Sequence, residues 1–273
     1  PVPSVPSTRM IFGGAAVGPA YSSINDIAPF FLTQLVFTNA NAGATNFIVG
    51  TNTLEFFNTP DIEQGGAGSF NVSNFITAYA NLTLGGNGAG TVNLATNITV
   101  SGSLTKIGAG TFALGGSNSF NGPLLVNGAG GTLRVDNKNA FSTNSFVVSN
   151  GTLYVTPTWT FGSGGELRSA LVTGSGSLWT NMVGLTIGNN AVVTVEAGGR
   201  MAVTGGVTVS SANSVPYSLI VSNGGSVVWW PTSGAYIYFG GSGTRAIATG
   251  VGSALRFSTG VYGGGANVFV GSG

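Results

Sequence analysis

KIGAGTFAL at residues 106–114 and GAGGTLRV at residues 128–135 share one pattern, in which a glycine and a threonine precede alternating apolar and variable residues. The same glycine begins GTVNL, GTFAL, GTLRV and GTLYV, at a regular spacing of about 20 residues. These glycines are Gly90, Gly110, Gly131 and Gly151. A pattern that returns at a fixed period indicates a repeat architecture, in which each copy forms one structural unit.

The unit extends in both directions along the chain. GSFNV at Gly68 lies one such unit before Gly90, and after Gly151 the unit lengthens. The glycines of this longer unit are Gly176, Gly199, Gly225 and Gly252. We therefore divide the chain into a non-repeat segment, residues 1–40, a region of about 20–22 residues per unit, residues 41–165, and a region of about 23–27 residues per unit, residues 166–273.

Each unit contains strand and turn signals. Alternation places Phe112 and Leu114, and in the next unit Leu133 and Val135, on one face of a strand, which predicts the core. Asn-Gly pairs between strands tolerate positive φ, and such a pair is also the strongest hairpin signal. Hairpins do not explain similar strands that recur once in every unit. We therefore predict an all-β parallel β-solenoid, a right-handed β-helix of roughly 10 to 12 coils with about 20–27 residues in each.

The repeated glycines are predicted to occupy a turn that poorly accepts a Cβ atom. This prediction covers Gly90, Gly110, Gly131 and Gly151. Asn127, Asn150 and Asn223 occur near the same place in their units, which suggests a ladder of stacked turns.

The segment at residues 101–135 resembles the autotransporter-associated β-strand repeat, also called the passenger-associated transport repeat, of secreted bacterial β-solenoid proteins. The residues that carry the resemblance are Lys106, Gly108, Gly110, Thr111, Asn118, Phe120, Val126, Asn127, Gly131, Thr132 and Leu133. The resemblance implies a bacterial protein at the cell surface or outside the cell, with an adhesive or scaffolding role.

Composition excludes several classes of function. Only 5% of the residues are charged, against roughly 25% in an average soluble domain. The net charge is +1 and the eight basic residues form no stripe, so we expect no nucleic acid partner. The apolar run at residues 27–37 is too short for a membrane span and is predicted to be a buried strand.

The chain has no histidine and no cysteine, so Ser-His, Cys-His and thiolate or imidazole metal chemistry is absent. A glycoside hydrolase would need two converging carboxylates, and Asp61 and Glu63 could share a strand face with Glu55 nearby. The alternatives are solvated charges in a loop after Pro60, or a single calcium site at Asp61 and Glu63. We expect no enzyme activity, no cofactor and no metal.

Aromatic residues are the better binding candidates, because sugar rings stack on planar side chains. Trp229 and Trp230 should point to opposite faces of a strand, so at most one of them is in the core. Trp229, Trp230, Tyr236 and Tyr238 are therefore candidates for a contact with a glycan or with another subunit, and packing is the alternative. Trp179 is predicted to be a core residue.

The function expected first is an extracellular structural subunit that assembles with copies of itself into a filament or sheath. Residues 1–40 would act as a cap or as a connector between subunits. The alternative is a cell-surface adhesin or glycan-binding passenger fragment, and a polysaccharide lyase or hydrolase ranks third. The 273 residues could also be one piece of a longer solenoid.

Overall fold

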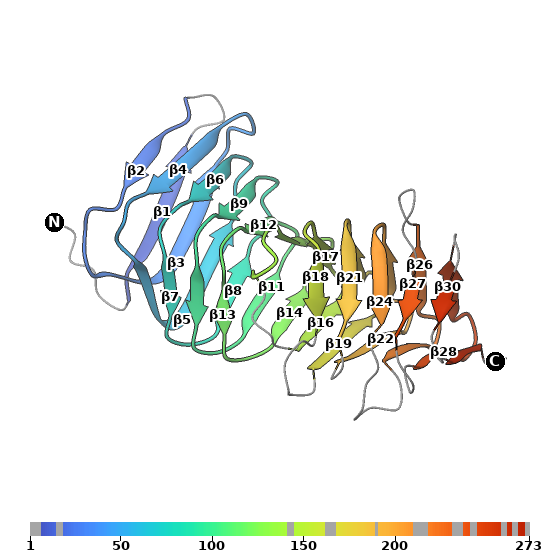
Figure 1. Ribbon diagram of the computed structural model, residues 1–273. Helices are drawn as coiled ribbons and strands as arrows, with labels where there is room; N and C mark the ends of the chain where they lie inside the picture. The colour runs from blue at the N-terminus through green and yellow to red at the C-terminus, as the bar shows by residue number, and fades with distance from the viewer. Residues whose placement is uncertain are drawn as a thin grey trace. The chain divides into compact units, whose positions relative to one another are not determined.

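The computed structural model describes residues 7–14, 19–140, 145–161, 168–188, 191–209, 218–230, 237–240, 245–257, 261–263 and 267–270. In this part of the chain all regular structure is β, and no helix occurs. Parallel sheets form a β-solenoid (Figure 1). The predicted fold class is confirmed. Among the described residues, the second sheets of the two units contain eleven strands in all, one from each coil, so the number of coils agrees with the expected 10 to 12.

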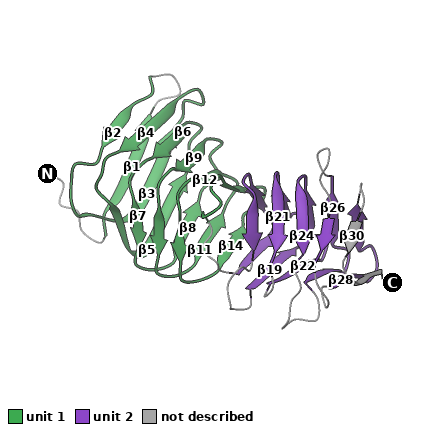
Figure 2. Ribbon diagram, in the orientation of Figure 1, with its two compact units in different colours: residues 1–142 green, residues 143–273 purple. Residues whose placement is uncertain are grey.

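The chain divides into two compact units, residues 1–142 and residues 143–273 (Figure 2). Unit 1 contains β1 (Arg9–Gly14), β2 (Ser22–Ile24), β3 (Phe30–Asn39), β4 (Thr45–Val49), β5 (Leu54–Gln64), β6 (Ser69–Val72), β7 (Ile76–Ala78), β8 (Leu82–Gly85), β9 (Thr91–Leu94), β10 (Ile98–Val100), β11 (Leu104–Ile107), β12 (Thr111–Leu114), β13 (Ser119–Phe120), β14 (Leu124–Asn127) and β15 (Thr132–Val135). Its strands pair in parallel as β1-β3-β5-β8-β11-β14 and β2-β4-β6-β9-β12-β15. The first half of β5 also starts a third ladder, β5-β7-β10-β13.

Unit 2 contains β16 (Phe146–Ser149), β17 (Thr152–Val155), β18 (Trp159–Phe161), β19 (Arg168–Thr173), β20 (Leu178–Asn181), β21 (Gly184–Ile187), β22 (Ala191–Glu196), β23 (Arg200–Val203), β24 (Gly206–Val209), β25 (Leu219–Ser222), β26 (Ser226–Trp229), β27 (Ile237–Phe239), β28 (Arg245–Thr249), β29 (Ala254–Phe257), β30 (Val261–Gly263) and β31 (Asn267–Val270). They form three parallel sheets, β16-β19-β22-β25-β28-β31, β17-β20-β23-β26-β29 and β18-β21-β24-β27-β30.

The register confirms that one sequence repeat is one coil. Thr91 pairs with Thr111, and Thr111 pairs with Thr132 in the coil after it. Each of these threonines directly follows a repeat glycine, so the strand pairing has the same period as the glycine pattern. In unit 2 the pairing of Val207 with Ile237 gives a coil that is longer than any the sequence pattern predicts.

Two of the repeat glycines are one residue out of register with the others. Leu178 pairs with both Thr152 and Arg200, so the residue aligned with Gly151 and Gly199 is Ser177 rather than Gly176. Ala254 pairs with Ser226, which aligns Ser253 rather than Gly252 with Gly225. The hydroxyl groups of Ser177 and Ser253 each donate a hydrogen bond to a backbone carbonyl oxygen four residues earlier.

The core is formed by the apolar positions that alternation predicts. Phe112, Leu114 and Leu133 are completely buried, and Val135 is 1% exposed. Trp179 is also completely buried, as predicted, and its ring makes an edge contact with Phe146 at 5.0 Å. Stacking these faces coil on coil removes a continuous apolar surface from water, which is the main stabilising contribution in a solenoid.

Part of the N-terminal segment that the sequence separates from the repeat belongs to the stack. β1 pairs with β3, β2 with β4, and β3 with β5, all in parallel. Phe30, Leu32 and Phe37 of β3 are buried, which confirms the buried strand predicted in residues 27–37. β1, β2 and β3 are therefore strands of the first coils instead of lying outside them.

The repeat glycines of unit 1 are confined by the neighbouring coil. A Cβ atom at Gly90 would overlap the Gly68 carbonyl oxygen, and one at Gly131 would overlap the Gly108 carbonyl oxygen. At Gly110 the nearest atom, the Gly86 carbonyl oxygen, is 3.1 Å away. None of these glycines has a positive φ. Close approach between stacked coils, rather than a left-handed turn, makes the position intolerant of a side chain.

The predicted asparagine ladder does not form, because Gly174 and Ala197 occupy the equivalent positions in the two coils between Asn150 and Asn223. Asn150 and Asn223 each follow a strand of the first sheet of unit 2 and have φ values of 69° and 50°. Asn127 lies inside β14, where it pairs with Ile107 of β11.

The described residues contain no helix that could span a membrane.

Candidate functional site

The two adjacent tryptophans point to opposite sides of β26, as the alternation predicts. Trp229 is 1% exposed and its indole N–H donates a hydrogen bond to the Gly205 carbonyl oxygen. Trp230 is 57% exposed. Of this pair, therefore, only Trp230 presents most of its ring to solvent.

The other two candidate aromatic residues are Tyr238 and Tyr236. Tyr238 lies in β27 of the third sheet and is 42% exposed, whereas Trp230 follows β26 of the second sheet. Tyr236 lies outside the described residues. Trp230 instead borders a groove of about 460 Å³ that is also lined by Arg200 and Arg256. The role of these aromatic residues in a glycan or subunit contact stays a prediction.

Asp61 and Glu63 lie on the same outward face of β5, as expected from their spacing. The Gln34 side-chain amide donates to Asp61 Oδ2 at 2.7 Å and to Glu63 Oε2 at 3.3 Å. Burial raises the pKa of Asp61, the hydrogen bond from Gln34 lowers it, the negative charge of Glu63 raises it and the positive charge of Arg9 lowers it. Glu55 is engaged separately, because its Oε2 accepts a hydrogen bond from the Tyr79 hydroxyl.

The neutral side-chain amide of Gln34 thus bridges the carboxylates of Asp61 and Glu63. Hard cations such as Ca²⁺ take six to eight oxygen ligands, whereas the described residues contain no group of three or more acidic, histidine or cysteine side chains that could hold a metal.

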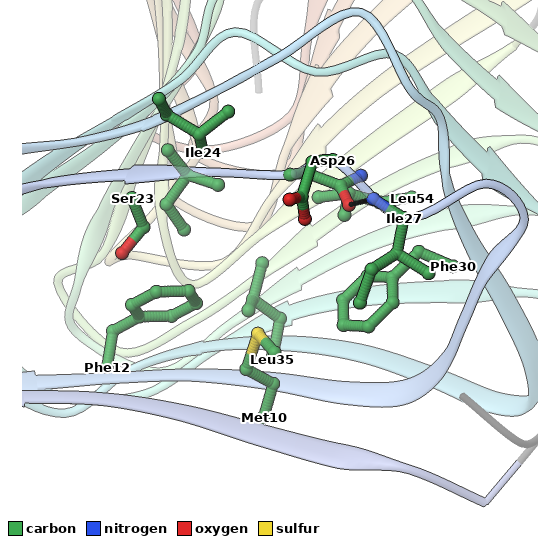
Figure 3. A pocket seen from close by; sticks show the side chains of 11 residues that line it. Met10, Phe12, Ser23, Ile24, Asp26, Ile27, Phe30, Leu35 and Leu54 are labelled. Carbon is green, nitrogen blue, oxygen red and sulfur yellow. Dashed lines mark hydrogen bonds between the residues drawn. The ribbon is translucent and has the colours of Figure 1, made fainter. Parts of the chain in front are cut away.

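The first coil of unit 1 leaves part of its apolar interior open (Figure 3). Met10, Phe12 and Ile24 line a pocket of about 190 Å³ together with buried Phe30 and Leu35. Met10 and Phe12 pair with Leu35 and Phe37, which are 1% and 0% exposed, yet they are themselves only half-buried. Ile24 is 73% exposed.

The strands that frame this pocket are edge strands within the described chain. There β1 pairs only with β3, and β2 pairs only with β4. An edge strand directs a row of backbone N–H and C=O groups away from its partner, which makes it a template for another strand. We call the pocket with β1 and β2 the first-coil face.

β29, the last described strand of the second sheet of unit 2, also carries apolar side chains that are only partly buried. Leu255 and Phe257 of β29 pair with Val227 and Trp229, which are 4% and 1% exposed. Leu255 and Phe257 are nevertheless only half-buried. We call these two residues with β29 the β29 face.

Sequence reasoning missed the pocket residues of the first coil. The signal was present in RMIF at residues 9–12, where Met10 and Phe12 alternate with Arg9 and Ile11. That alternation is very short and lacks the repeat glycine. Only the pairing with β3 reveals that these residues belong to a coil.

Comparisons of the chain with protein-family models, with curated proteins and with solved structures found no match.

Proposed function

We propose that this protein is an extracellular structural β-solenoid whose chains join end to end into a filament. The observation that carries the proposal is the first-coil face, where an apolar pocket and two edge strands are exposed together. The β29 face offers the complementary surface. Contact between two different surfaces does not close on itself, so it propagates as a fibre.

The dimensions of the pocket favour a protein side chain as its occupant. Ligand pockets usually enclose about 300–1,000 Å³. The first-coil pocket, at about 190 Å³, suits one or two apolar side chains from an incoming coil. Parallel strands on β1 and β2 would continue the sheets of unit 1 with the same pairing that joins its own coils.

The low charge of the chain supports the same function. Soluble β-proteins keep apart through charged side chains at their edges and on their surfaces. With eight basic and seven acidic residues among 273, few such charges are available. Among the described residues, Asp26 is the one charged side chain that lines the first-coil pocket.

The test places a lysine at the first-coil face. We expect the purified chain to form filaments in negative-stain electron microscopy and to sediment as a concentration-dependent series. Ile24→Lys should abolish elongation, because a charge beside an open strand edge opposes pairing. Val183→Lys is the control, since Val183 is 52% exposed at a corner of unit 2.

Two results would overturn the proposal. One is a wild-type chain that stays monomeric at every concentration tested. The other is an Ile24→Lys chain that forms the same filaments as the wild type and the Val183→Lys control.

A further inference from the structure

Three aromatic side chains form a column on the outer face of unit 1. The rings of Phe31 and Phe57 meet edge to face with centroids 5.3 Å apart, and the rings of Phe57 and Tyr79 stack with centroids 4.4 Å apart. They come from three successive coils, through β3, β5 and the residue that follows β7. We call Phe31, Phe57 and Tyr79 the aromatic column.

The column faces solvent rather than the core. Its chain neighbours Phe56 and Ala78 are completely buried, and alternation directs Phe57 and Tyr79 outward. Tyr79, which directly follows β7, is 50% exposed, and Phe75, which directly precedes β7, is 48% exposed. Phe31 and Phe57 are half-buried, so Tyr79 is the most exposed ring of the column. Exposed apolar groups that gather in one patch mark an interaction site.

A hydrogen bond fixes the ring at the exposed end of the column. The Tyr79 hydroxyl donates to Glu55 Oε2 at 3.1 Å, and this bond is the main cause that raises the pKa of Tyr79. The Tyr79 backbone N–H donates to the Phe56 carbonyl oxygen at 2.9 Å. The platform is therefore ordered before any ligand arrives, which reduces the entropy cost of binding.

A polar groove of about 460 Å³ continues the column along the same coils. It begins at Asn58, which directly follows Phe57, and it includes Asn81, two residues after Tyr79. Thr59, Asp61 and Thr83 add hydroxyl and carboxylate groups to its lining. The volume lies within the range of ligand pockets, and its side chains both donate and accept hydrogen bonds.

The charges near the column decide the class of ligand. Glu55, Asp61 and Glu63 are three of the seven acidic residues of the chain. Arg9 is the basic residue that acts electrostatically on Asp61. Juxtaposed like charges are costly at an interface, so polymers rich in carboxylate or sulfate groups are disfavoured.

We propose that the aromatic column and its adjoining groove bind a neutral polysaccharide. A pyranose ring carries C–H groups on its flat faces, and these pack on the face of Tyr79 that does not stack on Phe57. Its equatorial hydroxyls then reach the amides of Asn58 and Asn81 and the carboxylate of Asp61. The proposal is independent of assembly, since the column lies on the outer face of the coils.

The test is affinity electrophoresis of the full chain in gels that contain one polysaccharide each. The neutral probes are hydroxyethyl cellulose, laminarin and galactomannan, and the acidic probes are alginate and heparin. We expect retardation by at least one neutral polymer and by neither acidic polymer. Tyr79→Ala should weaken the retained interaction by about two- to ten-fold, given about 0.5–1.5 kcal/mol for an aromatic stack and 1.4 kcal/mol for each factor of ten.

Three further variants separate the contributions. Tyr79→Phe keeps the stacking ring and should retain most of the affinity. Thr59→Arg places a long side chain in the groove at an exposed position and should reduce binding without altering the column. Phe47→Ala is the matched control, because Phe47 is 40% exposed on β4, in the second sheet of unit 1, and is not part of the column or its groove. It should bind as the wild type does.

The proposal is overturned if no neutral polymer retards the chain, or if only the acidic polymers do. It is also overturned if Tyr79→Ala and Thr59→Arg, folded by circular dichroism, bind as well as the wild type. Equal losses in Tyr79→Ala and Phe47→Ala would likewise contradict a site at the column.

Discussion

In unit 2 the residue that follows each described strand of the first sheet, up to β28, has a positive φ, and glycine is not required there. These residues are Asn150, Gly174, Ala197, Asn223 and Gly250, with φ values of 69°, 90°, 50°, 50° and 85°. In unit 1 the residues after β8 and β11 also have positive φ, of 98° and 70°, but both are glycines, Gly86 and Gly108. The same backbone conformation is therefore adopted by glycine in unit 1 and by asparagine, alanine or glycine in unit 2.

The space at the corner explains the difference. A Cβ atom at Gly86 would overlap the Gln64 carbonyl oxygen, and one at Gly108 would overlap the Gly86 carbonyl oxygen. At Gly174 the nearest atom, Ser177 Oγ, is 3.7 Å away. Gly86 and Gly108 are thus needed both for their conformation and for their lack of a side chain, whereas at Gly174 only the conformation is required.

The hydrogen bonds of the corners follow the same division only in part. In unit 1 the N–H groups of Gly88 and Gly110 donate to the carbonyl oxygens of Gln64 and Gly86 in the preceding coil. In unit 2 the N–H groups of Gly199 and Gly225 donate to Glu196 and Ser222, three residues earlier in the same corner. The corners at Gly88 and Gly110 are thus bonded from coil to coil, whereas the next corner of unit 1 closes locally like those of unit 2, since Gly131 N–H donates to the Gly128 carbonyl oxygen.

The largest expected effect tests the close approach of the coils in unit 1. Gly90→Ala should lower the free energy of unfolding by about 3 kcal/mol, the upper part of the range for overpacking. Its Cβ would overlap the Gly68 carbonyl oxygen and lie 2.6 Å from Gln64 Nε2. Urea unfolding followed by circular dichroism measures the change.

The control is the same substitution one coil later. Gly110→Ala brings its Cβ to 3.1 Å from the Gly86 carbonyl oxygen, so it should cost about 1 kcal/mol or less. Neither glycine has a positive φ, so the two variants differ in available space and not in backbone strain. Equal losses in both variants would contradict the explanation.

A second expected effect arises from a lysine in the core of unit 1. Lys106 is completely buried, and its Nζ donates to the carbonyl oxygens of Ile107 and Gly108 at 2.6 and 2.8 Å. The one salt bridge of the described chain joins Arg134 and Asp136, so no carboxylate pairs with Lys106 there. Burial lowers the pKa of Lys106 to about 8.

This pKa shift predicts that stability rises with pH. Between pH 8 and 10.5 the unfolded chain binds a proton at Lys106 that the folded chain has released, so raising the pH favours the folded state. The slope should approach about 1.4 kcal/mol per pH unit, the limit for one proton. Lys106→Met should remove this slope, and comparing the two chains cancels the ionisation of the tyrosines. If the free energies of unfolding of the wild type and Lys106→Met differ by the same amount at every pH between about 7.5 and 9.5, the lowered pKa of Lys106 is wrong.

The sequence predicted the coil and its core because both depend on local alternation and a regular period. Phe112 and Leu133 recur in equivalent strand positions of successive coils, and each is buried. The prediction also separated Trp229 from Trp230 correctly. A strand period of two residues is sufficient for such statements.

The aromatic column could not be predicted from alternation and period alone. Phe57 and Tyr79 are separated along the chain by the same interval as the paired residues of β5 and β7. Phe31 is displaced from that row, since it pairs with Glu55 and contacts Phe57 diagonally. Outward positions vary from coil to coil, so their neighbours become known only when the register of each pair of strands is known. The corner glycines were recognised for the same reason as the core, but their cause, contact with the preceding coil, required the stacked backbone.

The smallest expected effect concerns two equivalent turns of unit 2. Ala197 and Asn223 each occupy the first central position of a two-residue turn, with a φ of 50° at both. The second central residues, Gly198 and Gly224, have φ values of 80° and 79°, so both turns are of type I′. Alanine is strained in this left-handed region by roughly 1–2 kcal/mol, whereas asparagine visits it readily. Ala197→Asn should therefore raise the free energy of unfolding by about 0.5–1 kcal/mol, and Asn223→Ala should lower it by a similar amount. Both side chains are exposed, so packing contributes little to either change. The control is Ala202→Asn within β23, which should not stabilise the chain because asparagine is unfavourable in strands. If Ala197→Asn destabilises the chain, or if both exchanges change stability in the same direction, then conformation alone does not decide which residues the corners of unit 2 accept.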